Sequence, residues 1–249
     1  MANEVEIEVN LNESGVSQSM NSRLLRGCIE YLLYQRQQLP IPYHELVRIV
    51  EDQEKLCDGL EAGLIERPLA SRRSLNTEYK KAKKVYEDVE CLFDHINKLF
   101  LSTIVKSAMV LLGSTPVSPK ERYFVKFPVA KEVNTADSSA RVCNSACRKL
   151  IRSLISNQEL GSFKDISPTS MLVFIQANRS SDVEWFRPKP TFKPPHRGQS
   201  CKITVSTTSC SEQLAVSDPP DHSMDEWLWF QAPVIIRGTK TGQESVSSL

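Results

Sequence analysis

Cys143 and Cys147 are the two residues of this chain whose spacing comes nearest to a metal site. Positions i and i+4 share one face of a helix, so two thiolates there could hold zinc if a second pair of Cys or His ligands lay near them. The sequence has no second pair close by, and its four histidines form no HExxH motif. We therefore interpret both cysteines as small core residues and expect no metal site.

The sequence also lacks the motifs of nucleotide chemistry. Its nine glycines include neither a Gly-Lys-Ser/Thr loop nor a glycine triplet after a predicted strand, the two elements that cradle phosphates. No local grouping of Ser, His and Asp indicates a catalytic triad, although such residues can meet through the fold alone. We predict a protein that is not an enzyme and uses no cofactor. A hydrolase is the alternative, and it would show turnover that is lost on changing one Ser or Cys.

The composition is that of a soluble globular domain, with 249 residues, 40% hydrophobic and 24% charged. The 31 basic and 30 acidic side chains give a formal charge of +1, so no excess of charge points to nucleic acid or a membrane as a partner. The N-terminus has no export signal, and the longest apolar runs are too short to span a bilayer. The seven cysteines are then expected to be reduced thiols in the cytosol or nucleus.

Four stretches have the hydrophobic periodicity of helices: 21–33, 43–57, 75–100 and 138–158. The first begins at an Asn21/Ser22 cap and ends before Pro40. The apolar stripe of 75–100 is wider than a coiled-coil seam, which favours a central helix packed under a sheet, and the KKAKK run beside it is expected to face solvent. We predict a flexible N-terminal tail over 1–21, one domain over 22–238 and a flexible C-terminal tail over 239–249.

The strand predictions come after the central helix. Segments 105–112 and 122–129 are separated by turn residues and predict a hairpin, and further strands are expected at 171–177, 184–192, 202–208 and in the aromatic segment 227–238. Helices followed by a hairpin, another helix and more strands are typical of an α+β domain with a mostly antiparallel sheet.

The helix over 138–158 carries more apolar surface than a narrow core stripe needs. Cys143, Cys147, Leu150 and Leu154 form the stripe itself. The remaining residues of interest lie beside it and are Arg148, Ile151, Arg152 and Ile155. An apolar strip edged by arginines has the composition of a protein interface, but a wide core stripe is the alternative interpretation.

Two polar or proline-rich segments also point to surface contacts. Gln35, Arg36, Gln37 and Gln38 end the first helix, and such a row must either face water or meet another surface, because unpartnered amides are costly to bury. Segment 184–198 contains four prolines, which cannot donate to a sheet. It is therefore expected at a sheet edge or in an exposed arm.

Four blocks of the sequence together resemble one family. They are YQRQQLPIPY, LLGSTPVSPKERY, EWFRPKPTFKPPHRG and WLWFQAPVIIRG, and they occur in this order between residues 34 and 238. They are similar to the comet family of HORMA-like proteins, spindle-checkpoint antagonists that bind the closed form of Mad-two. The resemblance implies a single HORMA-like α+β domain with three main helices packed on one face of the sheet.

The resemblance also implies a function as an adaptor. Such a protein binds closed Mad-two and presents it to the pachytene-checkpoint AAA+ ATPase, which promotes disassembly of the mitotic checkpoint complex and checkpoint silencing. It would work in the nucleus and cytoplasm, and at the spindle or kinetochore in mitosis. The alternative is a HORMA-type peptide-binding module acting on another client. We expect 227–238 to pair with the domain's own sheet, which leaves no free peptide-capturing site.

Within the family, the positions of Gln35 and Ile151 belong to the client-binding face, and those of Pro188 and Lys189 to the ATPase-binding arm. The neighbours of the first two extend the predicted client-binding set, which is Gln35, Arg36, Arg148, Ile151, Arg152 and Ile155.

Overall fold

The structure is a computed structural model that describes residues 4–11, 16–61, 69–128, 140–179, 181, 184–207 and 227–239, and only the backbone over 56–61 and 69–78. The helices are α1 (Gln18–Gln35), α2 (Tyr43–Glu61), α3 (Leu69–Ser102), α4 (Ala140–Ser156) and α5 (Gln158–Gly161). The strands are β1 (Glu4–Asn10), β2 (Val105–Leu112), β3 (Glu121–Lys126), β4 (Ser170–Asn178), β5 (Arg187–Pro188), β6 (Gln199–Ser206), β7 (Trp227–Gln231) and β8 (Ile236–Arg237).

One sheet runs through the domain in the order β1-β6-β3-β2-β4-β7-β5, and β8 pairs with β4. β6 pairs in parallel with both β1 and β3, while the other described pairings are antiparallel. The hairpin predicted from the turn residues is β2–β3. The α+β class and the mostly antiparallel sheet are therefore confirmed.

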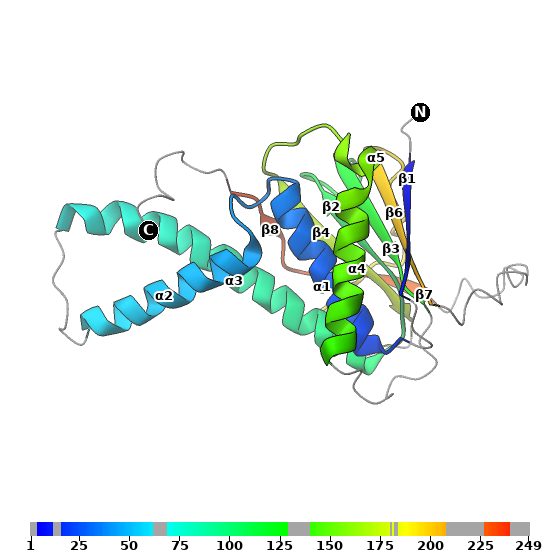
Figure 1. The fold of residues 1–249 in the computed structure, drawn as a ribbon, viewed down its shortest axis with the longest axis horizontal. Helices are drawn as coiled ribbons and strands as arrows, with labels where there is room; N and C mark the ends of the chain where they lie inside the picture. Colours follow the sequence, from blue (N-terminus) through cyan, green and yellow to red (C-terminus); the bar gives the residue numbers. More distant parts are fainter. Residues whose placement is uncertain are drawn as a thin grey trace, which may run out of the picture.

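Helices α1, α3 and α4 cover one face of this sheet (Figure 1). Their apolar stripes and the inward residues of the strands form the main core, which includes Leu25, Leu92, Leu150, Val110 and Ile203. In α4, Cys143, Leu150 and Leu154 of the predicted core stripe are buried together with Ala146, while Cys147 and Ile151 are partly buried against the core. The central-helix prediction holds for the second half of α3. Its first half runs away from the sheet beside α2, so that the two helices project as a hairpin (Figure 1).

The opposite face of the sheet carries no helix among the described residues (Figure 1). A smaller apolar cluster lies on this helix-free face, and Phe124 and Phe192 pack against it. The buried members of the cluster are Met109, Leu111, Leu172, Phe174 and Trp229.

The predicted flexible tail over 1–21 is wrong where the structure describes it. β1 pairs in register with β6, and it buries Val5, Ile7 and Val9 while its glutamates face outward. α1 begins earlier than predicted, because the side chain of Ser17 accepts a hydrogen bond from the N–H of Met20 (3.2 Å) and caps the helix. Asn21 and Ser22, the predicted cap, are buried inside α1. The strand over 4–10 could not be predicted from its own residues, because its pairing partner, β6, lies about 190 residues further along the chain.

The predicted C-terminal tail over 239–249 lies outside the described residues except for Thr239. The backbone N–H of Thr239 donates to the carbonyl of Gln38 (2.9 Å), so this residue is attached to the end of α1. In the described part of the chain, no helix combines the length and apolarity that crossing a membrane requires.

Candidate protein interface

A groove of about 960 Å³ lies between α1 and α4 and reaches the start of α2. Its floor and walls come mainly from two helices that pack against each other. The lining residues from α1 include Arg23, Arg26, Glu30, Tyr31 and Tyr34. Those from α4 include Cys147, Arg148, Ile151, Arg152 and Ile155.

The groove side of α4 follows from the position of its core stripe. Cys143, Ala146, Leu150 and Leu154 are buried. Ile151, one step around the helix, is half-buried at the margin of the core, and Ile155 is 66% exposed. Ile155 therefore does not belong to a wide core stripe. Instead, it lies exposed on the wall of the groove.

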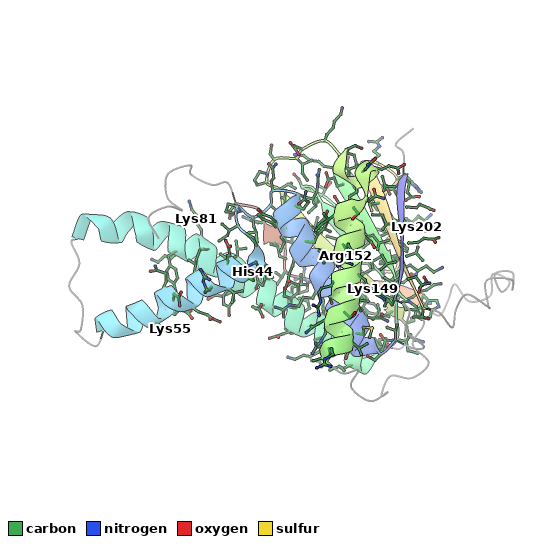
Figure 2. The ribbon with its side chains drawn as sticks, viewed as in Figure 1. His44, Lys55, Lys81, Lys149, Arg152 and Lys202 are labelled. Carbon is green, nitrogen blue, oxygen red and sulfur yellow. The ribbon has the colours of Figure 1, made fainter. Side chains whose placement is uncertain are left out.

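The arginines of α4 frame this apolar strip. Arg148 and Arg152 are both exposed, and Figure 2 shows Arg152 on α4 next to Lys149. Lys149 donates to the carbonyl of Leu11 (2.9 Å), whereas the Nε of Arg148 donates only to the carbonyl of Asn144 within α4 (3.2 Å). In the described residues neither arginine forms an ion pair, so both charges are available to a partner.

Arg26, on the facing helix, has a different role. Its guanidinium pairs with Glu30 (2.9 Å) and Glu90 (3.3 Å) and lies 4.4 Å from the ring centroid of Phe93. The carboxylate of Glu90 also accepts a hydrogen bond from the hydroxyl of Tyr43 (2.7 Å). Arg26 thus ties α1 to α2 and α3.

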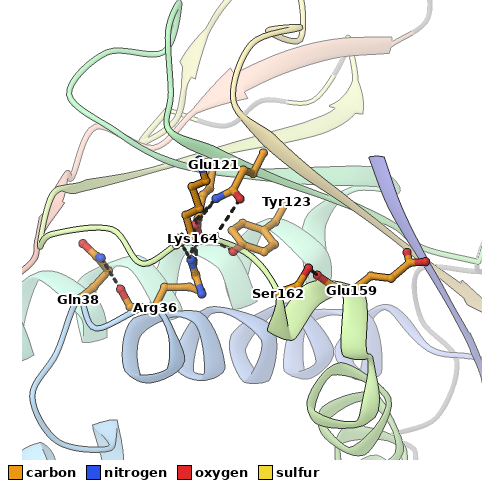
Figure 3. A network of polar contacts seen from close by, with 8 residues as sticks. Arg36, Gln38, Glu121, Tyr123, Glu159, Ser162 and Lys164 are labelled. Atoms are coloured by element: carbon orange, nitrogen blue, oxygen red, sulfur yellow. Dashed lines mark hydrogen bonds and ion pairs between the residues drawn. The ribbon is translucent and has the colours of Figure 1, made fainter. Parts of the chain in front are cut away.

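Arg36 does not lie on the groove, and its assignment to the client-binding set is wrong. Its side chain is buried and pairs with the buried carboxylate of Glu121, and it donates to the carbonyl of Lys164 (2.7 Å; Figure 3). Glu121 also accepts a hydrogen bond from the hydroxyl of Tyr123 (2.7 Å). Burial alone would lower the pKa of Arg36, but the hydrogen bonds and negative charge of Glu121 outweigh it and raise the pKa, so the guanidinium stays charged.

The glutamine row at the end of α1 divides into two kinds. Gln35 and Gln37 are exposed, and Gln37 has a left-handed backbone (φ 53°). Gln38 is buried with its amide satisfied: it donates to the carbonyl of Arg36 (2.6 Å) and accepts from the N–H of Thr169 (2.7 Å). Only Gln35 and Gln37 are therefore accessible, and Gln35 lies beside the groove-lining Tyr34 without lining the groove itself.

Tyr34 was not among the predicted site residues. It is 47% exposed and lines the groove opposite the arginines of α4. The available signal was an aromatic residue at the end of a helix, next to the apolar stripe of Leu32 and Leu33 but outside it.

Pro188 and Lys189 lie on a different part of the molecule. Pro188 is in β5, the last strand of the sheet order, and the N–H of Lys189 donates to the carbonyl of Trp229 in β7 (2.7 Å). The expectation of an edge position for this proline-rich segment is confirmed. The aromatic segment 227–238 also pairs with the domain's own sheet as predicted, through β7 and β8 on β4.

Among the residues that the structure describes, no group of three His, Cys, Asp or Glu side chains could hold a metal ion. Cys143 is a buried free thiol, as expected of a core residue, whereas Cys147 is a free thiol that is only half-buried at the margin of the core.

Comparisons with known proteins agree with this architecture. A family model, p31comet, described as "Mad1 and Cdc20-bound-Mad2 binding", matches residues 9–241. The "MAD2L1-binding protein" of Homo sapiens is 26% identical over 211 residues, 84% of this chain and 71% of the relative. That of Mus musculus is 28% identical over 217 residues, 84% of this chain and 70% of the relative. Both relatives are named as binding proteins and not as enzymes. The α+β fold is consistent with a single HORMA-like domain, and the chain belongs to the p31comet family.

Proposed function

We propose that this chain binds the closed form of Mad2, the Mad-two of the family resemblance, through the groove between α1 and α4. The observation that carries the proposal is the position of Ile155, 66% exposed beside half-buried Ile151 and framed by the unpaired charges of Arg148 and Arg152. Protein interfaces concentrate their binding energy in such apolar anchors, and arginine is enriched around them. The names of the related proteins support Mad2 as the partner.

The proposed client-binding face consists of Gln35, Arg148, Ile151, Arg152 and Ile155. Tyr34 is added to it because it lines the same groove. Arg36 is removed because its buried carboxylate partner holds it inside the fold.

We further propose that the bound client is presented to the pachytene-checkpoint AAA+ ATPase through the arm that contains Pro188 and Lys189. The ATPase would then remodel Mad2 and promote disassembly of the mitotic checkpoint complex and checkpoint silencing. Such an adaptor would act in the nucleus and cytoplasm, and at the spindle or kinetochore in mitosis. An edge strand apart from the α1/α4 groove supports a second contact that leaves the first one free.

Affinity for closed and open Mad2 tests the first part of this proposal. The double variant Ile151→Ala/Ile155→Ala should bind closed Mad2 more weakly by about 2 kcal/mol or more, since it removes both apolar anchors of the strip. Ile235→Ala is the matched control, because Ile235 is also an exposed isoleucine (42%) but lies outside the groove. Unchanged affinity in the folded double variant, or equal affinity for the two forms of Mad2 in the natural chain, would contradict the proposal.

The alternative of a peptide-capturing module is less well supported. Capture by strand addition at β4 would need an unpaired side of that strand, and β7 and β8 already pair with it. The two functions differ in a direct measurement, because a peptide-capturing module would bind a short extended motif tightly in the absence of Mad2.

A further inference from the structure

A segment rich in cations crosses the helix-free face of the sheet. It comprises residues 187–197, RPKPTFKPPHR, and is called the cationic strap below. The strap begins in β5 at the sheet edge and ends just before β6. It contains four Lys or Arg residues and one His but no Asp or Glu.

The middle of the strap is fixed to the sheet by Phe192. The ring of Phe192 stacks on that of Phe174 in β4 (centroids 4.2 Å apart, planes at 8°) and meets the ring of Trp229 in β7 edge-on (5.6 Å). A turn precedes this anchor, in which the N–H of Phe192 donates to the carbonyl of Lys189 (3.1 Å). Aromatic pairs in these arrangements add to the stabilisation from burial, so the strap is held at its centre.

The far end of the strap is held as well. The guanidinium of Arg122 in β3 donates to the carbonyl of buried Pro195. Gly198 follows with a left-handed backbone (φ +90°), and a Cβ there would lie 2.6 Å from the carbonyl oxygen of Pro119. Only glycine fits this close approach. Together with the β5–β7 pairing, the strap has three attachment points, and its prolines further restrict the backbone between them.

The cations of this fixed segment have no partners in the fold. Arg187, Lys193 and Arg197 are exposed, and Lys189 is half-buried. No ion pair involves any of them within the described parts of the chain. Unpaired like charges on a rigid segment repel one another, and this repulsion destabilises the folded chain. A bound partner of opposite charge removes the repulsion.

We infer that the entire cationic strap, and not only Pro188 and Lys189, docks onto an acidic protein surface. The inference rests on the proposed function, in which this partner is the AAA+ ATPase. A protein is favoured over nucleic acid because the outward row of β1, which shares this face of the sheet, carries Glu4, Glu6 and Glu8. Glu4 lies near Arg122 (3.9 Å) and Glu6 pairs with Lys202 (2.9 Å), so the face beside the strap has mixed charge and offers no continuous basic track to an extended polyanion. A folded partner with a local acidic patch can cover the strap alone.

Phe192 is a positioning residue in this arrangement. It contacts Phe174 and Trp229, not the partner, and it keeps the cations on either side of it at a constant place on the sheet. A rigid strap loses little conformational entropy on docking, which is the reason for anchoring a charged segment in this way.

The test measures binding of the full chain to the ATPase at low and high salt. Lys193→Glu/Arg197→Glu should bind at least about tenfold more weakly at low salt, and the difference should shrink as salt rises, because exposed charges are screened over about 10 Å at 0.1 M. Lys80→Glu/Lys98→Glu, which reverses two exposed lysines of α3, is the matched control and should bind like the natural chain. Lys193→Arg/Arg197→Lys should retain affinity. Closed Mad2 binding should be unchanged in all three variants.

Hydrogen exchange separates positioning from contact. Phe192→Ala should bind the ATPase several-fold more weakly and show faster amide exchange over 187–197, whereas Lys193→Glu/Arg197→Glu should leave exchange in this segment unchanged. Equal loss of affinity in the α3 control, or undiminished affinity of the folded Lys193→Glu/Arg197→Glu variant, would overturn the inference while the proposed ATPase contact stands. Tight strap-dependent binding of duplex DNA or of anionic phosphatidylserine vesicles would overturn the choice of a protein. Failure of the natural chain to bind the ATPase would overturn the proposed function and the inference with it.

Discussion

At the scale of single residues, the buried pair of Arg36 and Glu121 joins the end of α1 to β3. Their side chains are 7% and 0% exposed, and Glu121 also holds the hydroxyl of Tyr123 and the amide of Gln199. A buried pair of this kind contributes little net stability, but removal of one partner leaves an uncompensated charge in the interior.

Arg36→Met and Glu121→Gln should each lower the free energy of unfolding by about 3 to 5 kcal/mol, since each leaves the other side chain buried without its partner. The double variant should cost clearly less than the sum of the two single changes. Urea unfolding measures all three, with Arg152→Met as a control at an exposed arginine, where little change is expected. If the loss of unfolding free energy in the double variant equals the sum of the two single losses, the two side chains are not coupled.

Two buried thiols give the protein a dependence on alkaline pH. Burial raises the pKa of Cys28 and of Cys201 from the ordinary 9.0 to about 12. Between these values the unfolded chain has lost the thiol proton while the folded protein keeps it. The stabilising effect is therefore complete below pH 9 and is lost as the pH rises toward 12.

The free energy of unfolding should fall as the pH is raised from 8 to 10.5 under reducing conditions, with a slope of up to about 1.4 kcal/mol per pH unit for each thiol above pH 9. Cys28→Ala/Cys201→Ala should be less stable at pH 8 but show a shallower decline. Urea unfolding at several pH values measures both quantities. Parallel curves for the two proteins would rule out the thiols as the source of the slope.

At the scale of elements, Gln38 connects three segments. Its side chain accepts from Thr169 just before β4 (2.7 Å), its carbonyl accepts from Thr239 just after β8 (2.9 Å), and its Oε1 lies 2.7 Å from where a Cβ on Gly238 would be. β8 itself pairs with β4 and buries Ile236 in the main core, and the N–H of Gly238 donates to the carbonyl of Thr169 (2.8 Å). The end of α1 thus secures the end of the described chain.

Gln38→Ala should therefore loosen β8. We expect faster amide exchange over 236–239 and a loss of about 1 to 3 kcal/mol in stability, because the N–H of Thr169 is left without its acceptor. Gln37→Asn is the control, since Gln37 is exposed and asparagine tolerates its left-handed backbone. Exchange that rises evenly over the whole domain would indicate general destabilisation and not release of this one segment.

At the scale of the whole molecule, the two proposed docking surfaces belong to opposite layers. The groove lies between α1 and α4, in the helical layer, whereas the cationic strap crosses the helix-free face of the sheet (Figure 1). The sheet stands between them, so one partner can be bound without covering the surface for the other.

A ternary complex of closed Mad2, this chain and the ATPase should consequently form without competition. Each double variant should weaken only one binary affinity: Ile151→Ala/Ile155→Ala the affinity for Mad2, and Lys193→Glu/Arg197→Glu the affinity for the ATPase. When the two are combined, the losses of binding free energy should add within about 0.5 kcal/mol because the sites share no contacts. Sizing chromatography of the mixture and titration of each binary pair measure this. Displacement of one partner by the other would show that the surfaces overlap.

Several elements of this fold could be predicted from local pattern alone. The strand over 105–112 was predicted with the bounds that it has, and α4 within two residues at each end, because alternation and 3.6-residue periodicity are properties of neighbouring residues. The seven-residue alternation of 4–10 is equally regular, yet it was missed. A strand at the end of a chain is stable only if another strand pairs with it, and β6 follows about 190 residues later.

The sequence by itself determined the class of the domain, the narrow core stripe of α4 with isoleucines beside it, and the edge position of the proline-rich segment. Each depends on residue spacing or on the chemistry of a single residue type. Only the tertiary structure decided which arginines are free. Arg36 resembles Arg148 and Arg152 in the sequence, but Glu121, 85 positions away, draws it into the interior, while no described carboxylate reaches the two arginines of α4. Burial of a charge depends on a partner brought close by folding, and that information is not local.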